Sequence, residues 1–222
     1  GKEIGYTDLM AAQGDVARGI ISMDELGRME QAALPGCGAC NLLGTANSMN
    51  YLTEALGMAL PGSAIPAATG KRLALAKQTG KKIIELFEKN ILPRDIITLE
   101  AIENAIAIDL AIGGSTNTIL HLTALANEAG IDFDVNTFTR MAKNIPHLVK
   151  MKPAQGGHYP VDFYQAGGVT ALMGRLSKQG LLHDNALTVT GNTVAENVKS
   201  VNVSDDNVIR PFTNPYSAQG GI

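Results

Sequence analysis

Apolar side chains recur every three or four residues through most of this chain, which is the spacing that places them on one face of an α-helix. Pro-Gly, Gly-Gly and Ala-Gly pairs separate the repeats. Side chains that can cap a helix precede several of them, namely Ser22, Thr98, Ser115 or Thr116, and Asn136. The pattern predicts helices over 22–34, 47–60, 71–90, 99–112, 117–128, 136–143 and 162–178.

The helix predicted over 71–90 is amphipathic. Leu73, Ile83, Ile84 and Phe87 share its apolar face, and its lysines fall on the other face. We therefore expect the apolar face to pack against a core. The helix over 99–112 has an apolar stripe and few charges, and we expect it to be the most buried one.

The pattern changes near Asn185. Residues 187–190, 198–203 and 208–209 are short β-branched runs separated by Asn, Asp and Gly, which is typical of strands and turns. We therefore predict a helix-rich domain over 1–185. Residues 186–222 are too few for an independent β domain, so we expect them to begin a second domain that the chain truncates.

Composition excludes several classes of protein. With 222 residues and 45% hydrophobic content, the chain is long and apolar enough to bury a core. A net charge of -3 disfavours a nucleic-acid partner, and no apolar run approaches the ~18 residues of a membrane span. Two cysteines cannot form a secreted disulfide scaffold, and no export signal opens the chain, so we expect a cytoplasmic protein. Because the chain begins without Met and stops at Ile222, we expect it to be a fragment.

Both cysteines, Cys37 and Cys40, fall in the glycine-rich segment 35–40 between two predicted helices. Their spacing suits iron–sulfur ligation, because both thiols can reach one cluster and nearby N–H groups stabilise thiolates. A thioredoxin-like redox pair has the same spacing, although no strand clearly precedes it. Zinc would need about four ligands, and the four histidines are scattered. Two buried structural cysteines are the remaining alternative.

A second candidate site is the loop Gly113-Gly114-Ser115-Thr116-Asn117, between two apolar helices. Small polar side chains and free N–H groups at a helix start can hold a carboxylate or a hydroxyl. A helix-turn-helix corner with its own cap would have the same composition. The loop lacks the Gly-Lys-Ser/Thr ending of a phosphate-binding P-loop. His121, one helical turn further on, more often represents a hydrogen-bonded core residue than a base.

Taken together, these motifs resemble one family. The segment 35–40, then 44–50, 54–58 and 60–63, is similar to the central signature of the dihydroxy-acid dehydratase and phosphogluconate dehydratase family. The loop 113–117 with 120–122 resembles that family's second signature, and 166–169, 210–211 and 214–217 resemble it in the same order. The similarity extends over nearly the whole chain.

The resemblance implies an α/β family fold. This chain would supply the mostly helical remainder of the N-terminal domain and the first strands of a C-terminal β-barrel-like domain. It implies a hydro-lyase that converts a 2,3-dihydroxy acid to a 2-keto acid in branched-chain amino-acid biosynthesis. The implied cofactors are an iron–sulfur cluster ([2Fe–2S] or [4Fe–4S]) and Mg²⁺, and the implied assembly is a dimer or a larger homo-oligomer.

By position in the motif, the resemblance makes Cys40 a cluster ligand and ranks Cys37 second. Gly114, Ser115, Thr116 and Asn117 would line the substrate or the cluster. The family's other cluster cysteines, its magnesium ligands and its catalytic serine cannot be mapped onto this sequence, so we expect the isolated chain to be inactive. Residues 44–45 resemble the phosphogluconate branch, whereas 49–50, 53–57 and 166–169 resemble the dihydroxy-acid branch, so a sugar-acid dehydratase is the alternative. A non-catalytic helical metal-binding module is a further one.

Overall fold

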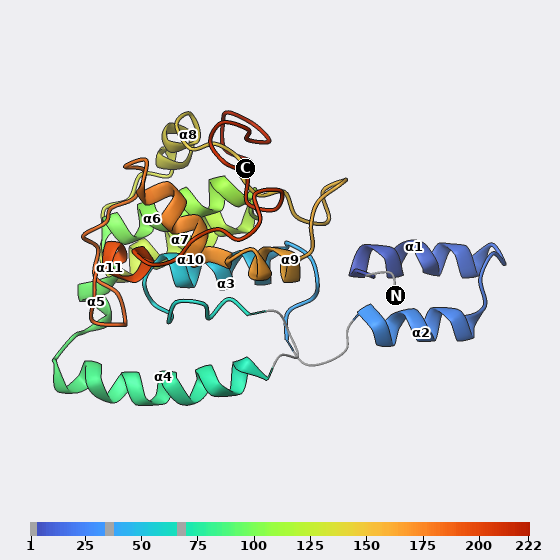
Figure 1. The fold of residues 1–222 in the computed structure, drawn as a ribbon, viewed down its shortest axis with the longest axis horizontal. Helices are drawn as coiled ribbons and strands as arrows, with labels where there is room; N and C mark the ends of the chain where they lie inside the picture. The colour runs from blue at the N-terminus through green and yellow to red at the C-terminus, as the bar shows by residue number, and fades with distance from the viewer. Residues whose placement is uncertain (1–3, 34–37, 66–69) are drawn as a thin grey trace.

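A computed structural model describes residues 4–33, 38–65 and 70–222, and these fold into helices joined by turns (Figure 1). The helices are α1 (Tyr6–Ala17), α2 (Met23–Ala33), α3 (Thr45–Ala55), α4 (Lys71–Glu88), α5 (Pro93–Ile96), α6 (Leu99–Ile112), α7 (Asn117–Ala129), α8 (Asn136–Ala142), α9 (Pro160–Gln165), α10 (Gly168–Ser177) and α11 (Val194–Val198). The mostly helical character predicted for the chain is confirmed.

Local capping explains where several helices begin. Ser22 Oγ accepts a hydrogen bond from the Glu25 N–H at 3.1 Å, ahead of α2. Thr98 Oγ1 accepts one from the Ala101 N–H at 3.3 Å, ahead of α6. Both side chains satisfy an N–H group that a helix start leaves without a partner. The two predicted caps are therefore confirmed.

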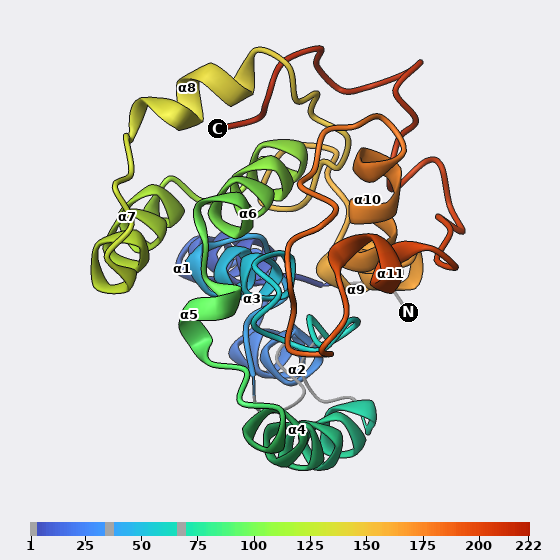
Figure 2. The ribbon, with the colours of Figure 1, turned by 90° about the vertical axis from the view of Figure 1, so that its left-hand side faces the viewer.

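Helix α6 lies at the centre of the core. Figure 2 shows it between α7 and α10, and α3 and α8 also pack against it. As predicted, it is the most buried helix, since eleven of its residues are buried. The largest side chains without solvent exposure include those of Leu52, Ile102, Ile106, Leu122 and Leu172. Burial of apolar surface at this centre is the main stabilising contribution to the fold.

Glycines in the left-handed region divide two of the predicted helices. The prediction of a single helix over 162–178 is wrong, because Gly167 has φ +112° and separates α9 from α10. The helix predicted to reach Leu60 ends at Ala55, because Gly57 has φ +77°. A Cβ at Gly57 would also lie 3.0 Å from the Leu187 carbonyl oxygen, so the backbone there approaches another segment closely.

The strands predicted after residue 186 are wrong. The described residues there take part in isolated bridges, Leu187 with Thr193 and Ser217 with His147, and residues 194–198 form helix α11. Thr193 and Glu196 make a reciprocal capping box, with the Glu196 N–H donating to Thr193 Oγ1 at 3.3 Å and the Thr193 N–H donating to Glu196 Oε2 at 2.8 Å. The described residues 186–222 therefore do not contain the first strands of a β-barrel-like domain. The division near Asn185 stays a prediction.

Helix α4 covers nearly the predicted span, but it does not pack as predicted. Leu73, Ile83, Ile84 and Phe87 are 80%, 59%, 58% and 83% exposed, and Leu86 is the buried residue of this helix. The expectation that the apolar face packs against a core is wrong, because the described residues leave these four side chains exposed. None of the helices in the described part of the chain combines the length and apolar character that a membrane span needs.

Candidate functional site

The loop that carries Cys40 is fixed by the first turn of α3. Asn47 is buried, and its Nδ2 donates hydrogen bonds to the carbonyl oxygens of Cys40 at 2.7 Å and Leu42 at 2.6 Å. The Leu43 N–H donates to the Lys152 carbonyl oxygen at 2.6 Å. The backbone beside the half-buried Cys40 is thus held from both sides. Cys37 lies outside the described residues.

The loop 113–117 meets the same turn of α3. The Ser115 N–H donates to Ser48 Oγ at 3.0 Å, and Asn117 Nδ2 donates to Thr45 Oγ1 at 2.7 Å. The hydroxyls of Thr45 and Ser115 lie 3.4 Å apart. Two segments about 70 residues apart in sequence, both singled out by the sequence analysis, therefore lie side by side at the starts of α3 and α7.

The four loop residues predicted as site residues differ in their surroundings. Ser115 and Asn117 bond to α3, and Thr116 is exposed. Gly114 faces inward, because a Cβ at this position would lie 1.8 Å from Asp109 Oδ1. Only glycine can therefore occupy position 114 without displacing the Asp109 side chain.

Three buried polar side chains lie beneath the loop, and two of them, Asp109 and Thr118, are not predicted as site residues from the sequence. Ser48, Asp109 and Thr118 have no solvent exposure. Thr118 Oγ1 contacts Asp109 Oδ2 and lies 2.6 Å from the Ser115 carbonyl oxygen. Burial raises the pKa of Asp109 from its ordinary 3.8 to about 7, and the Thr118 hydroxyl opposes that rise. The available sequence signal was a single acidic residue within the apolar run 105–112.

Glu54 is a further buried acid, in the last turn of α3. Its Oε1 accepts hydrogen bonds from the Gly62 N–H at 2.9 Å and from Thr170 Oγ1 at 2.5 Å. Its Oε2 accepts from the Ala64 N–H at 3.1 Å and from Ser63 Oγ at 3.4 Å. Burial raises the pKa of this carboxyl, and the four donors counter part of the rise.

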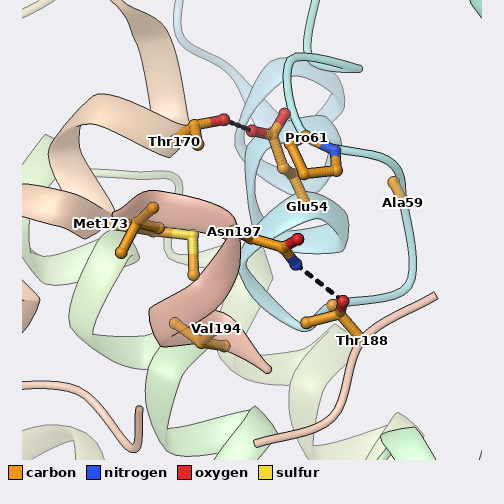
Figure 3. Close-up of a pocket in the computed structure, with 10 residues that line it drawn as sticks. Glu54, Ala59, Pro61, Thr170, Met173, Thr188, Val194 and Asn197 are labelled. Carbon is orange, nitrogen blue, oxygen red and sulfur yellow. Dashed lines mark hydrogen bonds between the residues drawn. The ribbon is translucent and has the colours of Figure 1, made fainter. Parts of the chain in front are cut away.

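Figure 3 shows Glu54 facing Thr170 at the edge of a small, mostly apolar pocket. Met173, Val194 and Pro61 also line it, and Asn197 Nδ2 donates to Thr188 Oγ1 at 2.8 Å across it. Among the described residues, the four groups that bond to Glu54 are all donors, and they join α3 to α10 and to the segment 62–64. Glu54 is therefore a structural link.

The described residues contain no group of three or more His, Cys, Asp or Glu side chains that could hold a metal ion. Cys40 is a soft thiol donor on a fixed loop, and it fits the role of one ligand among several. The described part of the chain does not form a complete metal centre. His121 is exposed, so the expectation of a buried, hydrogen-bonded histidine is wrong.

Comparison with known proteins gives consistent matches. A sequence model described as the dihydroxy-acid/6-phosphogluconate dehydratase N-terminal domain matches residues 1–197. A dihydroxy-acid dehydratase of Caldicellulosiruptor bescii is 54% identical over 210 residues, which are 94% of this chain and 38% of that protein. The dihydroxy-acid dehydratases of Caldicellulosiruptor saccharolyticus and Pyrococcus furiosus are 53% and 49% identical over 223 aligned positions, which cover 100% of this chain and 40% of each relative. The chain thus spans about 40% of the length of these relatives.

Proposed function

The chain belongs to the dihydroxy-acid/6-phosphogluconate dehydratase family, and we propose from this membership that it is the helical part of a hydro-lyase acting on a 2,3-dihydroxy acid. The observation that carries the proposal is the meeting of the Cys40 loop and the 113–117 loop on one turn of α3. The similarity to relatives that bear the name dihydroxy-acid dehydratase extends across the whole of this chain, and therefore across the region of both loops.

The proposed reaction removes the C2 proton and the C3 hydroxyl of the substrate as water. The enol that remains takes up a proton at C3 and becomes the 2-keto acid, so no oxidant or reductant is consumed. The Ser115 and Thr45 hydroxyls and the Asn117 amide are the polar groups of this chain that meet between α3 and α7. We assign to them the orientation of the substrate's carboxylate and hydroxyl oxygens.

Cys40 is the residue of this chain that would hold the iron–sulfur cluster, and Cys37 is the second candidate. When bound, the cluster and Mg²⁺ supply Lewis acidity for the leaving hydroxyl and the carboxylate. Asn47 contributes by holding the Cys40 and Leu42 carbonyl groups, which limits the positions that the thiolate can adopt. The remaining ligands, the magnesium site and the catalytic base are not assigned to residues of this chain.

A sugar-acid substrate is the second candidate, because the family description includes 6-phosphogluconate dehydratases. The printed names of the relatives favour the dihydroxy acid. With this activity we propose a homo-oligomer that works in the cytoplasm on a small carboxylic acid, without a nucleic-acid or membrane partner.

A chimaera tests the proposal. Residues 1–222 replace the matching segment of the Caldicellulosiruptor bescii enzyme, and the product is assayed with a branched dihydroxy acid and with a sugar acid. We expect dehydration of the branched acid. Cys40→Ser should remove both the visible absorbance of the cluster and the activity, whereas Asn41→Ser, a change in the same loop, should retain both.

Retention of cluster absorbance and activity by Cys40→Ser would overturn the assignment of Cys40. A folded chimaera that binds a cluster but dehydrates only the sugar acid would overturn the substrate. A folded chimaera that dehydrates neither acid would overturn the activity.

A further inference from the structure

Asp109 lies in the last turn of α6, in the most apolar part of the molecule. Its neighbours in sequence, Ile108 and Leu110, are 0% and 1% exposed. Its Oδ1 has no hydrogen-bond partner among the described residues, and its Oδ2 contacts the Thr118 hydroxyl. An ionised carboxylate in this position would be left with one hydrogen bond, which is a costly way to bury a charge.

The hydrogen atoms available around Thr118 indicate where the proton lies. Thr118 Oγ1 has one hydrogen, and it lies beside two oxygens, Asp109 Oδ2 and the Ser115 carbonyl oxygen at 2.6 Å. A carbonyl oxygen can only accept. If Thr118 donates to Ser115, both contacts become full hydrogen bonds when the carboxyl group of Asp109 is protonated and donates to Thr118 Oγ1.

The charges around Asp109 favour the same state. The C-terminal end of α6 carries a partial negative charge that disfavours an anion in its last turn. The pKa of Asp109 responds to burial and to the Thr118 hydroxyl, and to no ionised side chain of the described residues. The titratable groups on the helices packed against α6 are Tyr51 and Glu54 on α3, His121 and Glu128 on α7, Arg140 on α8 and Arg175 on α10.

None of those groups is among the causes that shift the pKa of Asp109. Glu54 bonds to Gly62, Ala64, Ser63 and Thr170, Arg175 bonds to the Ile209 carbonyl oxygen and to Asp206, and the Tyr51 ring packs against Phe163. His121, Glu128 and Arg140 are exposed to solvent. His147, next to Gly113, contacts the Val149 carbonyl oxygen at 2.8 Å.

We propose that Asp109 is a neutral carboxylic acid in the folded protein, and that it positions the 113–117 loop by donating its proton to Thr118 Oγ1. Thr118 then donates to the Ser115 carbonyl oxygen, while Ser48 holds the Ser115 N–H from the other side. Ser115 is thereby fixed at both of its backbone polar groups. Gly114 allows this arrangement, because its missing Cβ leaves the space that Oδ1 occupies. The inference does not depend on the proposed enzymatic activity.

The consequence for stability has a defined sign. The folded pKa of Asp109, about 7, lies above its ordinary value of 3.8, so between these values the folded state binds a proton that the unfolded state has released. The contribution of Asp109 is therefore fully present below pH 3.8 and is lost as the pH rises toward 7. The folding equilibrium constant should fall by up to about tenfold for each pH unit in that window.

Asp109→Asn tests the assignment, because the amide can donate to Thr118 as the acid does but cannot ionise. Urea unfolding of the 222-residue chain is measured from pH 4 to pH 8 for the wild type, Asp109→Asn and the exposed control Asp132→Asn. We expect Asp109→Asn to equal the wild type near pH 4. Its folding constant should then gain on that of the wild type as the pH rises, and the control should run parallel to the wild type.

Carbon-13 NMR of wild-type chain labelled at the Asp carboxyl carbons keeps the proposal testable even where Asp109→Asn does not fold. One carboxyl carbon, that of Asp109, should titrate near neutral pH. Titration of every Asp carboxyl below about pH 5 would overturn the proposal. So would a folded Asp109→Asn variant whose folding constant runs parallel to that of the wild type over the whole range.

Discussion

Replacing Glu54 with Gln changes one oxygen of a buried carboxylate to an NH₂ group. All four groups around the carboxylate are donors in the structure: the N–H groups of Gly62 and Ala64, and the hydroxyls of Ser63 and Thr170. A hydroxyl can rotate and accept a hydrogen bond from the new NH₂ group, whereas a backbone N–H cannot. Whichever way the amide is turned, one of the two N–H groups loses its acceptor.

The expected cost follows from that single loss. A buried donor without a partner costs about 1–3 kcal/mol of unfolding free energy, so Glu54→Gln should destabilise the chain by this amount at pH 7. Glu54→Ala leaves both N–H groups without an acceptor and should cost about 2–6 kcal/mol by the same reasoning. Because Glu54 joins α3 to α10 and to 62–64, the loss should affect global unfolding and not a local opening.

Urea denaturation followed by far-ultraviolet circular dichroism measures both free energies. Glu128→Gln, the same substitution at an exposed position of α7, is the control and should lie within about 0.5 kcal/mol of the wild type. If Glu54→Gln also lies within that margin, the four donors do not require a carboxylate and the reasoning fails.

Two further substitutions test the loops. Asn47→Ala removes the donor to the Cys40 and Leu42 carbonyl groups and should cost about 1–3 kcal/mol; unchanged hydrogen exchange across residues 40–44 would contradict this role. Gly114→Ala places a methyl group 1.8 Å from the present position of Asp109 Oδ1, so it should cost more than about 1 kcal/mol in urea denaturation. Gly70→Ala, at a position with open space around it, is the control for Gly114→Ala. Equal urea denaturation midpoints for these two variants would contradict the close approach of Gly114 to Asp109.

The helices that sequence predicts well are those whose ends are decided by neighbouring residues. Ser22 and Thr98 each accept from an N–H three positions later, and that information is contained in four residues. The capping box of Thr193 and Glu196 is equally local, but the β-branched residues of that region outweighed it in the sequence analysis. Here the cap decided the structure, and Val194 and Val198 pack into the helical core instead of forming a sheet.

The helix ends that sequence missed depend on distant contacts. The backbone at Gly57 turns where it meets Leu187, and Gly167 turns beside Asn202, whose carbonyl oxygen lies 3.2 Å from where a Cβ would be. No local pattern identifies such neighbours. Helix α4 is the opposite case, in which a local pattern gave the helix but not its packing. The apolar periodicity predicted the helix correctly, but it could not indicate what would cover the apolar face.

The candidate site, too, could be predicted from the sequence only in part. Its two loops could be singled out by composition and by resemblance, but their meeting depends on Ser48, Thr45 and Asn117, whose hydrogen bonds span 67 and 72 residues. The buried acid beneath them was visible as Asp109 within an apolar helix. Its partner Thr118 became apparent only when α7 was placed against α6.

Glu54 and Asp109 are two buried acids with different hydrogen-bonding requirements. Both side chains are almost fully buried, yet Glu54 has four donors around it and Asp109 has one hydroxyl that is shared with a carbonyl group. Replacement by the amide should therefore have opposite consequences at pH 8: Glu54→Gln leaves an N–H without an acceptor, whereas Asp109→Asn removes the cost of ionising or protonating a buried acid. At this pH the unfolding free energy of Glu54→Gln should be lower than that of the wild type. The unfolding free energy of Asp109→Asn should be equal to or higher than that of the wild type. Equal destabilisation by both would mean that Asp109, like Glu54, needs two acceptor oxygens and does not act as a donor.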